Sequence, residues 1–388
     1  MITKLRLKNW KSFKDSTLYI DPLTILIGVN ASGKSNVLDA FDFLKNLFAP
    51  LISYDEAMMG MPNNAIKATP YYSFKDAIKN IRGGKDWVIK RGETECDLEI
   101  TIKEGDEECV LDVKILLQTN NGNITIQPDI IHLNGEDLTP PDFNSSDYFK
   151  WFFAQSSNGL TRADNIYRFH EIARRNLQNI LVFNPIPNNM RGYSPVSSEL
   201  KPDGSNIAGV IAALNPEEKE KLEAELTKYV SPLPEKDIKK IQAVTVGLNN
   251  SDAMLYCFEE WNPDKAIDAR GMSDGTLRFA AIVVALLTAK PHSLLVIEEI
   301  DNGLHPSRAK ELVKVLKEIS IKRSVDVLCT THNPALVNEL GGEMIPFINY
   351  VKRDAEGNSV IELLEEKENL AKLMASSSIG DLMTEDKL

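Results

Sequence analysis

Three short, mostly apolar runs, each followed at once by polar or charged residues, dominate the hydrophobic pattern of the chain. They cover residues 23–27, 294–297 and 325–329. Runs of this length bounded by polar residues are typical of strands buried on both faces of a parallel sheet. After the first run, apolar residues recur at helical spacing at Val37, Leu38, Phe41 and Leu44. The pattern therefore predicts a strand, a turn and a helix in succession.

The rest of the chain predicts further elements of both kinds. Apolar and polar residues alternate over residues 93–135, which predicts an antiparallel β-layer because side chains along a strand alternate between its faces. The other predicted elements are helices over residues 147–179 and 206–230, strands over 180–183 and 348–351, and a charged tail of helical pattern over 362–388. We expect the tail either to cover the sheet or to bind a partner. No heptad run is long enough for a coiled-coil arm.

Residues 28–35 fit the phosphate-loop pattern G-x-x-x-x-G-K-[ST] and lie between the first predicted strand and its helix. Backbone N–H groups of such a loop surround the phosphates of a nucleoside triphosphate, and the helix dipole adds to the attraction. We expect Lys34 to reach the β- and γ-phosphates and Ser35 to bind Mg²⁺. The candidate nucleotide-binding residues are Asn30, Ala31, Ser32, Gly33, Lys34, Ser35 and Asn36.

Two adjacent carboxylates, Glu298 and Glu299, follow the second apolar run. At the end of a buried strand, one acid can enter the magnesium shell while the next acts as a general base toward an attacking water. The alternative is that they cap the next helix as acidic N-terminal residues.

His332 follows the third apolar run through two threonines, and Asn333-Pro334 then predicts the start of a helix. Parallel α/β sheets bind their ligands at this end of the strands, which makes His332 a candidate catalytic residue together with Glu299 and Lys34. The alternative is a capping histidine on a structural turn.

The order of these motifs resembles the ABC-type ATPase heads of the SMC, RecF and OLD families and of stand-alone AAA family ATPases in prokaryotic defence systems. The resemblance includes the opening segment, residues 2–13, the signature-like segment at residues 273–278 (Ser-Asp-Gly-Thr-Leu-Arg), and Gly303-Leu304-His305-Pro306 after the acidic pair. Residues 50–250 match only loosely.

The resemblance implies a fold and a set of roles. The fold is an α/β P-loop NTPase of ABC-ATPase type, with a mixed central sheet flanked by helices, an antiparallel β-layer and a helical subdomain. ATP and Mg²⁺ are the implied cofactors, and ATP lies between two heads, with Ser273 and Gly275 of one head facing the phosphate loop of the other. By the same resemblance, Glu298 is on the magnesium side, Glu299 is the general base, His332 contacts the γ-phosphate, and residues 302–305 form a loop that crosses the dimer.

The sequence departs from the family pattern at two positions. Glu298 stands where an aspartate is commoner, and Asp274 replaces a glycine of the signature, which sets a carboxylate near a polyphosphate. Slow turnover would be consistent with both changes. None of the glutamines clearly marks a Q-loop.

We expect five parts along the chain. They are the N-terminal part of the ATPase domain with the phosphate loop (1–50), an inserted β-layer and helical segment (51–180), a helical lobe (181–265), the C-terminal part of the ATPase domain with the signature, acidic pair and His332 (266–365), and a tail (366–388).

The composition predicts a large folded core, and the cysteine pattern predicts a protein of a reducing compartment. The chain has 388 residues, of which 43% are hydrophobic, and its four cysteines are far apart with no CxxC pair, which argues against a disulfide framework or a zinc site. It has no signal-peptide pattern and no apolar stretch long enough to span a membrane. We expect a cytoplasmic protein without a membrane partner.

The net charge of −12 argues against a generally basic DNA-binding surface, although a basic face can exist on an acidic protein. The candidate basic clusters are Lys4, Arg6 and Lys8; Lys75, Lys79, Arg82, Lys85, Lys90 and Arg91; and Arg168, Arg174 and Arg175. The alternative for each is an ordinary solvated face or a strand edge protected by lysines.

The sequence therefore predicts an ATPase that forms a homodimer or higher homo-oligomer around ATP. Hydrolysis would be coupled to sensing of double-stranded DNA or to control of a separately encoded effector such as a nuclease, in anti-phage defence. OLD-family nucleases carry a Toprim domain after the ATPase, and the 56 residues that follow His332 (388 − 332) are too few for one. The alternatives are a nucleotide-gated scaffold with little turnover and a DNA-repair ATPase of the RecF or SMC kind.

Overall fold

The computed structural model describes residues 1–47, 77–78, 81–118, 123–138, 160–232, 238–385 and 387–388. The chain divides into two compact units, each assembled from segments far apart in the sequence. The first unit comprises residues 1–21, 30–180 and 351–362, and the second comprises residues 22–29, 181–350 and 363–388. The five-part division along the chain stays a prediction.

The first unit is built on a six-stranded antiparallel sheet in the order β2-β1-β4-β5-β6-β7. The strands are β1 (Ile2–Lys8), β2 (Asp15–Tyr19), β4 (Glu95–Glu104), β5 (Glu107–Gln118), β6 (Asn123–Leu133) and β7 (Glu136–Asp137). The structure confirms the antiparallel layer predicted over residues 93–135 and adds the two N-terminal strands to it.

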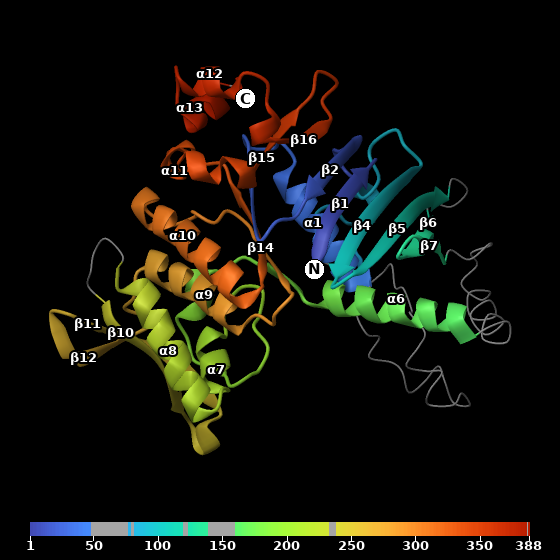
Figure 1. Ribbon diagram of the computed structural model, residues 1–388. Helices are drawn as coiled ribbons and strands as arrows, with labels where there is room; N and C mark the ends of the chain where they lie inside the picture. The colour runs from blue at the N-terminus through green and yellow to red at the C-terminus, as the bar shows by residue number, and fades with distance from the viewer. Residues whose placement is uncertain (48–76, 79–80, 119–122, 139–159, 233–237, 386) are drawn as a thin grey trace. The chain divides into compact units, whose positions relative to one another are not determined.

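Helix α6 (Leu160–Gln178) packs against β4, β5 and β6, as Figure 1 shows, and also contacts α1 (Lys34–Leu47). The sequence predicted one helix over residues 147–179, and its first part, 147–159, lies outside the described residues. A short 3₁₀ turn, η1 (Gly84–Trp87), precedes β4.

The three apolar runs are strands of a second sheet, in the order β16-β15-β3-β14-β13-β8. Its strands are β3 (Leu23–Ile27), β8 (Ile180–Phe183), β13 (Leu294–Ile297), β14 (Asp326–Thr331), β15 (Ile348–Arg353) and β16 (Ser359–Leu363). Every residue of β3, β13 and β14 is buried, and these strands pair in parallel. Ile27 is paired with Thr331 and Ile297 with Cys329, so the chain leaves these three strands at one edge of the sheet.

The core of the second unit is centred on helix α9 (Asp274–Thr288), in which every residue from Gly275 to Leu287 is buried. Helix α9 contacts α8 on one side and α10 on the other (Figure 1). The other helices of this unit are α7 (Ile207–Ala212), α8 (Pro216–Val230), α10 (Pro306–Arg323), α11 (Pro334–Glu339), α12 (Leu370–Met374) and α13 (Ile379–Thr384), with 3₁₀ turns η2 (Pro187–Met190), η3 (Leu248–Asn250), η4 (Gly342–Phe347) and η5 (Leu364–Glu366).

The structure confirms helix over most of residues 206–230 and divides the stretch into two helices, α7 and α8. Asn215 is the N-cap of the second helix, and its side chain accepts a hydrogen bond from the Glu218 N–H at 2.9 Å. Pro216 takes the first helical position, where its missing N–H costs nothing. The Asn-Pro pair therefore marks a new helix rather than the continuation of the old one.

Residues 181–265, predicted as a helical lobe, contain most of a four-stranded sheet beside their two helices, and the last strand of this sheet extends to Asp268. It is formed by β9 (Ser194–Pro195), β10 (Ile238–Val246), β11 (Asp252–Glu259) and β12 (Asn262–Asp268), with β9 and β10 paired to β11. The inward residues of β10 and β11 include Ile241, Ala243, Ala253 and Leu255. Their spacing of two residues is a strand signal that the helical interpretation overlooked.

The C-terminal tail packs onto the second unit. Helix α13 contacts α11, and the Gly380 N–H donates to Asn338 Oδ1 at 2.7 Å. A side chain at Gly380 would place its Cβ 2.3 Å from the Pro334 carbonyl oxygen, so the close approach requires glycine. The tail therefore covers a helix beside the sheet.

All four cysteines, Cys96, Cys109, Cys257 and Cys329, are buried, and no disulfide bond joins any two of them. Burial raises the pKa of Cys109 and of Cys329 to about 12 and raises that of Cys96 as well. Separately, every helix in the described ranges is too short or too polar to cross a lipid bilayer.

We expect none of the four thiols to react with a thiol-specific disulfide reagent at pH 8 while the protein is folded. The raised pKa keeps Cys96, Cys109 and Cys329 protonated, and burial excludes the reagent from all four sulfurs. Absorbance titration before and after denaturation should show all four reacting only in denaturant. Rapid reaction of one thiol in the native protein would contradict the burial.

Candidate nucleotide site

The phosphate loop leads from β3, in the second unit, to α1, in the first. Its backbone departs from ordinary geometry at Ala31 and Gly33, whose φ angles are 62° and 122°. The left-handed conformation costs a residue with a Cβ roughly 1–2 kcal/mol, so the surroundings must hold Ala31 in place. Lys34, the first residue of α1, is 8% exposed.

Side chains of the first unit bind the carbonyl groups of this loop. Arg353 donates from Nε and Nη2 to the Ala31 carbonyl oxygen at 3.1 and 2.9 Å, and the Ser359 hydroxyl donates to the Ser32 carbonyl oxygen. In a trans peptide the carbonyl and the next N–H point in opposite directions. The N–H groups of Ser32 and Gly33 are therefore turned away from Arg353 and Ser359. Successive N–H groups presented together form an anion-binding concavity.

The closeness of Ser359 explains the glycine at position 33. A Cβ there would lie 2.3 Å from Ser359 Oγ and 3.2 Å from Ser12 Oγ. Ser12 and Ser359 are themselves hydrogen-bonded at 2.8 Å, and Asn36 donates from its side-chain amide to Ser12 Oγ at 2.7 Å. Asn36, a predicted nucleotide contact, thus ties the start of α1 to the lysine-bearing turn that follows β1.

The acidic pair follows β13 in the second unit. Glu299 has a φ of 47°, and its N–H donates to Thr330 Oγ1 at 2.9 Å. The buried guanidinium of Arg278 donates from Nη2 to the carbonyl oxygens of Glu298 and Glu299 at 3.0 and 2.9 Å. The left-handed turn at Glu299 is therefore held by hydrogen bonds on both sides of the residue.

His332 lies beside the predicted general base. Its Nδ1 is 3.5 Å from Glu299 Oε1, and the two side chains are 39% and 42% exposed. The adjoining Thr331 hydroxyl donates to the buried Asp301 carboxylate at 2.7 Å. The end of β14 and the turn after β13 are thus joined by side chains as well as by strand pairing.

Neither capping alternative fits the structure. Helix α10 begins with His305 as its N-cap, several residues after the acidic pair, and α11 begins with Asn333 as its N-cap. Glu298, Glu299 and His332 therefore have no capping role at these helices.

The signature-like segment forms the N-terminus of α9. Ser273 is the N-cap and accepts a hydrogen bond from the Thr276 N–H at 3.1 Å. Arg191 donates to the carbonyl oxygens of Ala269, Arg270 and Met272 and also to the Asp274 carboxylate. The unusual negative charge of Asp274 is therefore balanced by a cation within the same unit.

Several residues that shape these sites were not singled out from the sequence: Arg191, Arg278, Asp301, Arg308, Arg353 and Ser359. Arg278 stands inside the signature-like segment and Asp301 two residues after the acidic pair, so the motifs themselves pointed to their neighbourhood. Arg353 and Ser359 carry no sequence signal, because more than 300 residues separate them from the loop they bind.

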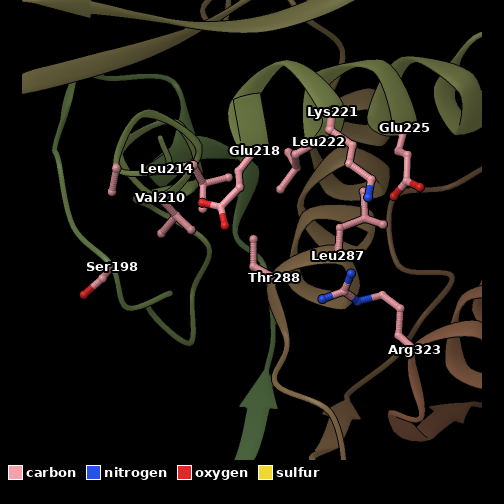
Figure 2. A pocket seen from close by; sticks show the side chains of 11 residues that line it. Ser198, Val210, Leu214, Glu218, Lys221, Leu222, Glu225, Leu287, Thr288 and Arg323 are labelled. Carbon is pink, nitrogen blue, oxygen red and sulfur yellow. The ribbon is translucent and has the colours of Figure 1, made fainter. Parts of the chain in front are cut away.

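A separate pocket of about 390 Å³ lies in the second unit, lined by α7, α8 and the ends of α9 and α10. Figure 2 shows Lys221 and Arg323 extending into it from opposite sides. None of the predicted site residues lines this pocket.

Most of the basic residues considered for DNA binding are paired with acids. The ion pairs are Lys4 with Glu99, Arg6 with Asp15, Lys8 with Asp97, Arg82 with Asp39, Arg168 with Glu107, Arg174 with Glu171, and Arg175 with Glu104. Arg91 lies over the ring of Trp87 at 4.5 Å. Lys75 and Lys79 lie outside the described residues. The pairing supports the ordinary-surface alternative for these clusters.

We expect Gly33→Ala to weaken nucleotide binding and to destabilise the fold by about 1–3 kcal/mol, because the new Cβ meets Ser359 and the φ is strained. Titration with a fluorescent ATP analogue and thermal denaturation would measure both effects. Gly342→Ala is the matched control, since its Cβ would meet no atom within 4 Å. Unchanged affinity in Gly33→Ala would contradict the geometry of the cradle.

Solved structures and family models identify the fold. The crystal structure of an SMC head bound to the C-winged helix domain of ScpA is 18% identical, with 93% of this chain and 96% of that chain covered and a TM-score of 0.51. The SMC head domain from Thermotoga maritima is 15% identical, with 93% and 98% covered and a TM-score of 0.47. The first similarity confirms the α/β fold of ABC-type ATPase heads.

No curated protein matches the chain. The model of the family described as "AAA domain, putative AbiEii toxin, Type IV TA system" matches residues 23–84 and 114–338, and the chain therefore belongs to this family of AAA domains.

Proposed function

We propose that the protein binds MgATP in its phosphate loop and hydrolyses it. The main support is the orientation of the loop backbone. Arg353 and Ser359 bind the carbonyl oxygens of Ala31 and Ser32, so the N–H groups of Ser32 and Gly33 face away from these two side chains. A cradle of N–H groups at a helix N-terminus, next to a buried lysine, suits a polyphosphate. Membership of an AAA domain family and the fold of ABC-type heads support the same conclusion.

The proposed roles follow the chemistry of the side chains. Lys34 contacts the β- and γ-phosphates, and Ser35 and Glu298 hold Mg²⁺, which neutralises phosphate charge when bound. Glu299 accepts a proton from the attacking water, and its held backbone keeps the carboxylate in position. His332 contacts the γ-phosphate. Its ring is 3.5 Å from Glu299, so the two side chains can orient a water together.

A second copy of the chain completes the proposed site. Ser273 is exposed at the N-terminus of α9, and the backbone of Gly275 lies beside it. These groups can donate to a nucleotide bound by another head, so we propose a homodimer or higher homo-oligomer that closes on ATP and opens after hydrolysis. Arg191 balances the charge of Asp274, which makes the signature less repulsive to phosphate than the sequence alone indicated.

We further propose that hydrolysis controls a separately encoded effector protein, such as a nuclease, in defence. The family description includes a putative toxin of a Type IV toxin–antitoxin system, and one similar SMC head is bound to a domain of ScpA. The ion-paired basic residues favour a protein partner over double-stranded DNA. A cytoplasmic location stays a prediction.

A nucleotide-gated scaffold with little turnover is the second candidate. The Asp274 carboxylate is 61% exposed at the signature despite its partner Arg191, and a negative charge there can slow closure on a polyphosphate. Stable retention of unhydrolysed ATP by the unmodified protein would favour this function.

We expect Glu299→Gln to lower the rate of phosphate release by about 10²- to 10⁴-fold while ATP still binds, because a general base contributes this much. Lys34→Ala should instead weaken binding, since the lysine contacts the phosphates. Glu366→Gln, on an exposed position of η5, is the matched control and should leave both unchanged. A full rate in Glu299→Gln would rule out its proposed role.

We expect linear duplex DNA to change phosphate release by less than about twofold at physiological salt, because paired basic residues release few counterions on binding. The same assay with and without DNA, repeated at low salt, measures this. Strong acceleration by DNA at physiological salt would instead support DNA sensing or a repair function.

A further inference from the structure

A chain of hydrogen bonds runs from the exposed signature serine into the core of the second unit. Ser273 Oγ lies 2.9 Å from Thr276 Oγ1 and accepts the Thr276 N–H at 3.1 Å. Thr276 is 4% exposed, whereas Ser273 is exposed. The outer hydroxyl can therefore meet a ligand, and the inner one cannot.

The inner end of this chain is an arginine from another helix. Arg308, near the start of α10, is 7% exposed and donates from Nη1 to Thr276 Oγ1 at 3.2 Å. A Cβ on Gly275 would lie 3.0 Å from this Nη1 and 3.2 Å from the Gly303 carbonyl oxygen. Glycine at position 275 therefore leaves the room in which Arg308 approaches the signature.

The charge of Arg308 decides the direction of the hydrogen bonds. A hydroxyl has one proton to donate, and arginine can only donate. If Ser273 donated to Thr276, the buried Thr276 proton would be left without an acceptor among the described residues, at a cost typical of buried unsatisfied groups. If Thr276 donates to Ser273, each of its polar groups is satisfied, and the adjacent cation makes it the better donor.

In this direction Ser273 Oγ accepts two hydrogen bonds, from the N–H and the O–H of Thr276. Both of its lone pairs are then occupied, and its own proton points outward. We propose that Arg308 is a positioning residue that, through Thr276, fixes Ser273 as a hydrogen-bond donor toward a phosphate oxygen of the nucleotide bound by a second copy. The inference rests on the proposed ATPase function and adds to it the residues that orient the signature serine.

The test is a double-mutant cycle on steady-state phosphate release. Arg308→Met removes the donor, and Ser273→Ala removes the hydroxyl it acts through. We expect Arg308→Met to lower kcat about tenfold with little change in KM, and to lower it less than about twofold when Ser273 is already alanine. Arg323→Met, the same change at the other end of α10, is the matched control and should show no such dependence on Ser273.

A second variant covers the case in which Arg308→Met does not fold. Thr276→Val keeps the shape of the side chain and removes the hydroxyl that donates to Ser273, whereas Thr276→Ser keeps the hydroxyl. We expect Thr276→Val to lose activity as Arg308→Met does, and Thr276→Ser to retain it. Thermal denaturation monitors folding of each variant.

The outcomes separate the two proposals. Arg308→Met and Thr276→Val could lower kcat as strongly in the Ser273→Ala protein as in the unmodified one. That result would overturn the positioning role of Arg308 and leave the ATPase function standing. A Thr276→Val variant that is folded and fully active while Ser273→Ala is impaired would do the same. Absence of any phosphate release from the unmodified protein would overturn both.

Discussion

The register of three buried parallel strands is the constraint on which the candidate site depends. Ile27 pairs with Thr331 and Ile297 with Cys329, so the phosphate loop, the acidic pair and His332 all begin at one edge of the sheet. These strands are buried throughout, and a slip of one residue would turn every side chain to the opposite face. The packing of the apolar strands thereby fixes where these polar segments begin.

A buried charge links that edge to the signature helix. Arg278 is 3% exposed in a helix whose other buried residues, apart from Thr276, are apolar, and burial lowers the pKa of its guanidinium. A buried cation is tolerated when most of its donors are satisfied. Nη1 and Nη2 of Arg278 donate to the carbonyl oxygens of Pro185, Glu298 and Glu299, whereas its buried Nε has no hydrogen-bond partner among the described residues. Through Arg278, a movement of α9 would therefore act on the backbone of Glu298 and Glu299.

The sequence predicted the strands and motifs of the site because those signals are local. A phosphate loop, an acidic pair or an apolar run is recognised within about ten residues. The division of residues 206–230 into two helices depends on Asn215-Pro216, which is a short signal. The sheet of β9–β12 was overlooked, although the two-residue spacing of Ile241 and Ala243 is a strand signal. The residues that hold the site, such as Arg353 and Arg308, could not be predicted, since they bind segments distant in sequence.

Three arginines of the second unit lie in or beside the signature-like segment, and each makes different hydrogen bonds. Arg191 holds the loop before α9 and the Asp274 carboxylate, Arg278 joins α9 to the acidic pair, and Arg308 reaches Thr276 from α10. Arginine suits this task because its planar fork makes several hydrogen bonds at fixed angles and stays charged when buried. Arg191 and Arg308 contact Asp274 and Thr276, close to the exposed Ser273, so cations offset the acidic residue next to that serine.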